Sequence, residues 1–137
     1  MLLATHTALV ERIELALANA DLPALAWYDV LWELEQAPER KLRMHELAQC
    51  IVLSRSNLTR LADRLETAGL LQREACSNDR RGNFLLLTDA GRAMRKKMWP
   101  VYRAQIVALF SNPIDDNQAT VMGDGFVSIL AALNAVE

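Results

Sequence analysis

The segment from residue 54 to residue 69 constrains the fold of this chain more than any other. Its apolar side chains follow the spacing of one face of a helix, at Leu58, Leu61, Ala62 and Leu65. The Ser54 hydroxyl can accept a hydrogen bond from the free amides of the next turn. Gly69 suits the position just after a helix. The pattern predicts a capped helix from Arg55 to about Ala68 with one buried face.

A hairpin with a charged tip is predicted directly after this helix. Residues 70–75 and 84–87 have the composition of two strands, and residues 77–79 and 81–83 carry the side chains that favour turns. Residues 44–53 precede the capped helix and have helical spacing of their own. A helix, a tight turn, a capped helix and a hairpin together describe a winged helix-turn-helix.

The rest of the chain is predicted to be helical apart from a short strand at 41–43. One helix covers roughly 4–20, a second opens near Pro23 and ends near Pro38, and a long helix capped by Thr88 runs to about Phe110. Pro100 lies inside that long helix and should kink it. A last helix follows Pro113, with Asp115 or Asp116 as its cap. The fold class is therefore mainly α with a small β-hairpin.

The charge of the chain is unevenly distributed. The net charge of the 137 residues is −2. Residues 54–97 hold ten basic and five acidic side chains, a local charge of +5, which leaves −7 for the remainder. A basic middle between acidic ends is expected where one region meets the phosphates of a nucleic acid and the others do not.

The polar face of the 55–68 helix carries side chains that read base edges or hold phosphates. With the basic residues of the hairpin, they form the predicted DNA-binding set: Ser54, Arg55, Ser56, Asn57, Thr59, Arg60, Arg64, Arg73, Arg80 and Arg81. The N-terminal half of such a helix normally enters the major groove, and the hairpin tip can reach a neighbouring minor groove. A solvated surface or a protein-contact surface remains the alternative for the helix alone, because the same topology also serves protein contacts.

Four stretches of this region resemble the MarR family of transcription regulators in order and spacing. They are LSRSNLTRLADRLE at 53–66, GLLQR at 69–73, NDRRG at 78–82 and LTDAGR at 87–92. The resemblance is close over roughly residues 23–103. It implies a homodimer built from the first and last helices, with two winged helices on a pseudo-palindromic operator in double-stranded DNA. Many members are repressors that a small, often aromatic ligand or thiol oxidation releases.

The resemblance also assigns roles within the hairpin, which is the wing of the family. Asp79 would pair with Arg81 to order the wing, and Arg80 would enter the minor groove, although the two arginines could exchange roles. Val52 departs from the family pattern, because it occupies the helix-turn-helix turn where residues tolerant of unusual φ are common.

Five aromatic residues and two cysteines are further candidates for regulation. The aromatic residues are predicted to lie on the second and fifth helices, where the resemblance places a ligand crevice: Trp27, Tyr28, Trp32, Trp99 and Tyr102. Plain core packing is the favoured alternative for them. Cys50 is expected to be a small core thiol. Cys76 enters the basic wing and is the candidate redox residue, although an exposed cysteine without a role is the simpler reading.

Other functional classes find little support in the sequence. His6 and His45 are isolated, so we expect no metal site, and neither a nucleophile–base motif nor a Gly-rich phosphate loop is visible. We therefore expect no enzyme and no cofactor, with a helical enzyme scaffold and a protein-binding winged helix as the competing interpretations. The sequence shows neither a signal peptide nor an apolar run of membrane-spanning length, so we expect a cytoplasmic protein.

The two ends of the chain are more apolar than one buried helix face requires. The excess residues are Leu2, Leu3, Leu9, Val10 and Ile13 near one end, and Phe126, Ile129, Leu130, Leu133 and Val136 near the other. Burial between two subunits would remove them from water. We therefore expect one domain over 1–137, with dimerisation helices at about 1–22 and 104–137 and the winged helix-turn-helix at about 23–103.

Overall fold

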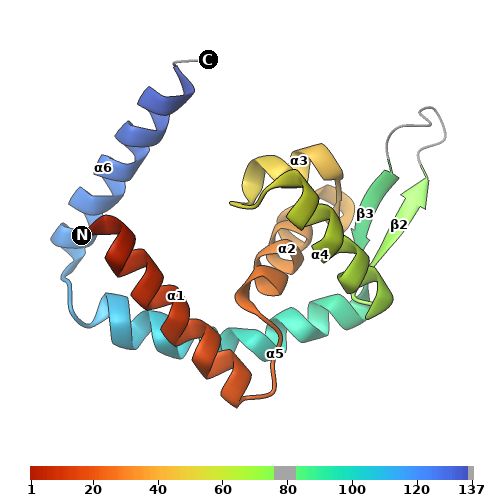
Figure 1. Ribbon diagram of the computed structural model, residues 1–137, viewed down its shortest axis with the longest axis horizontal. Helices are drawn as coiled ribbons and strands as arrows, with labels where there is room; N and C mark the ends of the chain where they lie inside the picture. Colours follow the sequence, from red (N-terminus) through yellow and green to blue (C-terminus); the bar gives the residue numbers. More distant parts are fainter. Residues whose placement is uncertain (76–82, 136–137) are drawn as a thin grey trace. The chain divides into compact units, whose positions relative to one another are not determined.

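The computed structural model describes residues 1–75 and 83–135 (Figure 1). The chain divides into two compact units, Met1–Tyr102 and Arg103–Glu137, and each is described by itself. The first unit contains α1 (Leu2–Asn19), α2 (Leu25–Gln36), a 3₁₀ turn (Pro38–Arg40), β1 (Lys41–Arg43), α3 (Met44–Cys50), α4 (Arg55–Thr67), β2 (Leu71–Ala75), β3 (Asn83–Leu87) and most of α5 (Asp89–Ile106). The predicted mainly helical fold with a small β-hairpin is confirmed.

The hairpin belongs to a three-stranded antiparallel sheet. The strand order is β1-β3-β2, so the short strand β1 pairs with β3 on the side opposite β2. Leu85 of β3 faces Leu42 of β1 and Arg73 of β2. Because β1 leads directly into α3, this pairing ties the start of the helix-turn-helix to the wing strands.

The buried face of α4 anchors this helix in the core of the first unit. Leu58, Leu61, Ala62 and Leu65 are all buried, as the spacing predicts. They join buried side chains from the other elements of the winged helix, among them Val30, Leu31, Leu34, Leu47, Leu71, Leu85 and Leu87. Close packing of this kind fixes the position of a helix, so the opposite face of α4 is presented to solvent in a defined orientation.

The joint between α4, β2 and α5 explains why two glycines and a threonine stand there. Gly69 ends α4 with a φ of +73°, a conformation that glycine adopts without strain. The Thr88 hydroxyl donates to the Gly69 carbonyl at 2.7 Å and accepts from the Gly91 amide at 3.0 Å, which caps α5. A Cβ at Gly91 would lie 2.0 Å from the Leu70 carbonyl oxygen, so only glycine fits this contact.

The turn between α3 and α4 resolves the question that Val52 raises. Among the described non-glycine residues, only Asp21, Glu39 and Arg40 have positive φ, so the Val52 backbone has no unusual conformation. The Leu53 amide donates to the Ile51 carbonyl at 2.9 Å, which forms a three-residue turn centred on a fully exposed Val52. A turn of the inverse γ type accepts a β-branched residue at its centre, because the central φ is negative.

The second unit consists of a π-helical turn (Val107–Ser111) and α6 (Asp116–Asn134), preceded by the last residues of α5. Asp115 caps α6, because its carboxylate accepts from the Gln118 amide at 2.8 Å while the Gln118 side chain accepts from the Asp115 amide. No residue of α6 is buried. Over the described part of the chain, no helix is long and apolar enough to cross a membrane.

Candidate nucleic-acid interface

The exposed face of α4 gathers most of the residues predicted to contact DNA. Seven of them lie on this helix or its cap and are exposed to solvent: Ser54, Arg55, Ser56, Asn57, Thr59, Arg60 and Arg64. The helix therefore presents a polar surface of hydrogen-bond donors and acceptors on the side opposite its buried leucines. Such a surface matches the donor and acceptor pattern of base edges and phosphates.

Local hydrogen bonds divide these residues into two groups. The Ser54 hydroxyl accepts from the Asn57 amide at 3.3 Å, and the Thr59 hydroxyl donates to the Arg55 carbonyl at 2.9 Å. Within the described ranges, no hydrogen bond or ion pair engages the side chains of Arg55, Asn57 and Arg60. Those three side chains keep their donors free for a ligand, whereas Ser54 and Thr59 also stabilise the helix.

Arg73 differs from the other predicted contact residues, because its guanidinium already binds two carboxylates. It forms an ion pair with Asp63 at 2.6 Å and another with Glu66, and both partners lie on α4. The hydrogen bond that Arg73 donates to the Asp63 carboxylate raises the pKa of Arg73, and the charge of Glu66 acts in the same direction. Arg73 therefore links the wing strand β2 to α4. Sequence spacing alone did not indicate this link.

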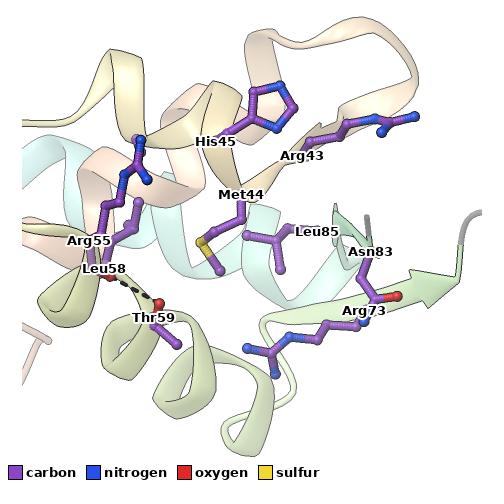
Figure 2. Close-up of a pocket in the computed structure, with 10 residues that line it drawn as sticks. Arg43, Met44, His45, Arg55, Leu58, Thr59, Arg73, Asn83 and Leu85 are labelled. Carbon is purple, nitrogen blue, oxygen red and sulfur yellow. Dashed lines mark hydrogen bonds between the residues drawn. The ribbon is translucent and has the colours of Figure 1, made fainter. Parts of the chain in front are cut away.

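A hollow of about 390 Å³ lies beside α4, between α3 and the sheet (Figure 2). Figure 2 shows Met44 and Leu85 between Arg43 and His45 on one side and Arg73 on the other. Arg55 also lines the hollow, so basic side chains from β1, α3, α4 and β2 surround an apolar floor.

Sequence reasoning missed Arg43 and its strand neighbour Lys41. Both cations lie over the Phe84 ring. The Arg43 guanidinium is 5.1 Å and the Lys41 ammonium 5.2 Å from the ring centroid. Their spacing of two residues on one short strand was the available signal, because alternate residues of a strand share a face. Arg43 lines the hollow beside α4 and adds positive charge there, whereas Lys41 forms an ion pair with Glu39 at 2.7 Å.

The wing tip and the redox candidate lie outside the described residues. This applies to Cys76, Asp79, Arg80 and Arg81. The last register pair leading to the tip joins Ala75 and Asn83. The predicted roles of these four residues stay predictions.

Four of the five aromatic candidates come together, and the fifth does not. The Tyr28 ring stacks on Trp32 at 6.3 Å and on Trp99 at 6.1 Å, and it meets Tyr102 edge-on at 5.1 Å. Trp27 instead packs against the core of the winged helix. The prediction that Trp27 belongs to the same cluster is wrong, because neighbouring residues of a helix point about 100° apart.

The expectation that Cys50 is a core thiol is also wrong. Its side chain is exposed at the last residue of α3, whereas Leu47 and Ile51 on either side of it along the chain are buried in the core. Partial desolvation, with help from the carboxylates of Glu33 and Glu46, raises the pKa of this thiol, which disfavours the reactive thiolate. Among the residues that the structure describes, no group of three or more His, Cys, Asp or Glu side chains could hold a metal ion.

Comparison with known sequences gives the first independent indication of identity. A sequence profile described as MarR family matches residues 20–82. The transcriptional repressor MprA of Escherichia coli strain K12 is 36% identical over 67 residues, which are 49% of this chain and 38% of that protein. The chain thus spans less than half the length of the curated relatives it matches.

Solved structures give a second indication, over nearly the whole chain. AbsC, a MarR family transcriptional regulator from Streptomyces coelicolor, is 28% identical with a TM-score of 0.88, over 97% of this chain and 89% of that one. Sco3205 is a MarR family transcriptional regulator from the same organism, solved in complex with DNA. It is 27% identical with a TM-score of 0.89, over 96% of this chain and 85% of that chain. Profile, relatives and fold agree: residues 20–82 match the MarR family profile, and the chain is similar in sequence and fold to MarR family regulators.

Proposed function

We propose that this protein is a sequence-specific DNA-binding transcriptional regulator that inserts α4 into the major groove. One observation carries the proposal. The buried leucines of α4 fix its position, while the side chains of Arg55, Asn57 and Arg60 form no hydrogen bond within the described residues. Arginine pairs with guanine and asparagine with adenine in that groove. The DNA complex of Sco3205 and the repressor function of MprA support the same role, with repression as the proposed output.

The proposed regulator acts as a homodimer. α6 leaves large apolar side chains exposed, among them Val121, Phe126, Val127, Ile129, Leu130 and Leu133, and α1 does the same at Leu2 and Leu3. Apolar patches of this extent are characteristic of protein interfaces. Two winged helices related by a twofold axis would read a pseudo-palindromic operator, because half-site symmetry mirrors protein symmetry.

The remaining predicted roles complete this proposal. In the wing, Asp79 orders the tip and Arg80 or Arg81 enters the minor groove, where narrow A·T tracts attract arginine. The aromatic pocket at Tyr28 and Trp99 receives a small effector that relieves repression, and the protein acts in the cytoplasm without a cofactor. A protein-binding winged helix is less well supported, because it needs no free base-reading side chains on α4. The MarR family is one of regulators, which argues against an enzyme.

Selection from a pool of random duplexes followed by gel-shift titration tests DNA reading. Arg60→Ala should weaken binding to the selected site by about 1–3 kcal/mol and relax the preference at one base position. Lys96→Ala is the matched control, because it removes one exposed positive charge from α5. If Arg60→Ala leaves both the affinity and the selected sequence unchanged, α4 is not the reading helix.

A further inference from the structure

A cavity of about 430 Å³ opens between α2 and α5, within the first unit. Four of its six lining residues are aromatic, and the other two are charged: Tyr28, Asp29, Trp32, Arg95, Trp99 and Tyr102. Trp32 and Trp99 are 39% and 40% exposed, so part of each side chain remains accessible to a ligand. The electron-rich faces of such rings attract cations.

The Asp29 carboxylate is a partly buried acidic group of this cavity. Within residues 1–75 and 83–135 it has no hydrogen bond and no ion pair. Burial raises the pKa of Asp29 to about 6, and the carboxylates of Glu33 and Glu14 add to the effect. Its charge also raises the pKa of Tyr102, after the larger effect of burial, and both residues line the cavity. A partly buried carboxylate without a partner costs free energy that a bound cation would recover.

The positive charge of the cavity, in contrast, already has a carboxylate partner, although two arginines share it. Arg95 forms an ion pair with Glu35, and its guanidinium lies 5.2 Å from the centroid of the Trp32 ring. Glu35 also accepts from the Arg92 guanidinium at 2.9 Å. An anionic ligand would therefore have to compete with Glu35 for Arg95 while it approached the free charge of Asp29.

We propose that this cavity binds an organic cation, in which an ammonium group carries an aromatic or branched apolar body. The ammonium group would lie against the Asp29 carboxylate, and the apolar body would lie on the faces of Trp32 and Trp99. The inference rests on the proposed function only for its regulatory consequence, because binding itself requires no DNA. It specifies the charge of the effector that this site would accept.

Calorimetric titration of the full chain with benzyltrimethylammonium at pH 7.5 tests the inference directly. Benzyl alcohol and benzoate serve as the neutral and anionic comparison ligands. We expect the cation to bind more tightly than both, and Asp29→Asn to weaken its binding about fivefold or more, which corresponds to loss of one charge contact. Glu33→Gln is the matched control, since it removes a carboxylate of the same helix that does not line the cavity. It should change the affinity less than about twofold.

A pH series separates Asp29 from the other ionisable groups around it. Those groups are His6 and Glu14 on α1, Glu33 on α2, and Arg95 and Tyr102 on α5. Because the charge of the probe does not titrate, its affinity should fall about fourfold to tenfold from pH 7.5 to pH 5 as Asp29 takes up a proton. The affinity of the Asp29→Asn variant for benzyltrimethylammonium should stay constant over the same pH range.

Three results would overturn the inference: benzoate binding more tightly than the cation, wild-type affinity in Asp29→Asn, or no binding of the cation. A pH dependence that persists in Asp29→Asn would also contradict it. Operator binding is measured separately by gel shift. A cation that binds as expected without changing operator affinity supports this inference and contradicts only the effector role in the proposed function.

Discussion

Replacement of Arg73 by methionine distinguishes a clamp between wing and helix from a DNA contact. The guanidinium of Arg73 on β2 binds Asp63 and Glu66 on α4, and its side chain is only 27% exposed. Methionine keeps the apolar stem of the side chain and removes the charge. If Arg73 is a clamp, Arg73→Met loosens the wing against α4 and destabilises the fold without removing a phosphate contact.

The expected magnitude follows from the exposure of the two partners. Asp63 is 59% exposed and Glu66 39% exposed, so water screens both ion pairs. Ion pairs of this kind contribute about 0.2–1 kcal/mol each. Arg73→Met should therefore lower the free energy of unfolding by about 1 kcal/mol. A double-mutant cycle with Asp63→Asn should show a coupling of about 0.5 kcal/mol, because the two residues are in contact.

Urea unfolding at 25 °C and DNA titration at several salt concentrations decide between the two roles. A phosphate contact contributes about 0.9 to the slope of log affinity against log salt, and we expect Arg73→Met to keep the wild-type slope. Arg64→Met is the matched control, because Arg64 is exposed on α4. It should lower the slope and leave stability unchanged. Wild-type stability combined with a reduced slope in Arg73→Met would refute the clamp.

Three further predictions concern the fold, the dimer and the cavity. Gly91→Ala should lower the free energy of urea unfolding by about 1–2 kcal/mol. A Cβ placed 2.0 Å from the Leu70 carbonyl oxygen costs more than the gain of about 1 kcal/mol in helix propensity. Light scattering of the wild type should report twice 15.4 kDa, and Leu130→Glu should reduce the mass to that of one chain. The raised pKa of Asp29 means that its ionised form opposes folding, so Asp29→Asn should raise the free energy of urea unfolding at pH 7.5 but not at about pH 4.

The features that the sequence predicts correctly are those that depend on neighbours along the chain. The α4 helix follows from the apolar spacing of Leu58 to Leu65 and from a cap whose donor and acceptor, Asn57 and Ser54, are three residues apart. The Thr88 cap and the positive φ of Gly69 are local in the same way. Local hydrogen-bond and packing rules are enough to predict such features.

The features that it misses depend on contacts between distant segments. Arg73 meets Asp63 and Glu66 only because β2 folds back along α4, and no local pattern shows this approach. Cys50 is the exposed last residue of α3, while the core contacts at this end come from Leu47 and Ile51. Trp27 could have been separated from Tyr28 and Trp32 by helical geometry, since only the latter two share an i, i+4 face.

One helix connects the proposed effector cavity to the proposed reading helix. α2 carries Tyr28, Asp29 and Trp32 on the side of the cavity, and its other side contributes Val30, Leu31 and Leu34 to the core cluster that contains Leu58, Leu61 and Leu65 of α4. All six of those core side chains are almost completely buried. Close-packed interiors transmit displacement, because there is no free volume to absorb it. A ligand that moved α2 would therefore have to move α4 as well, and in the proposed function the position of α4 determines which bases Arg60 can reach.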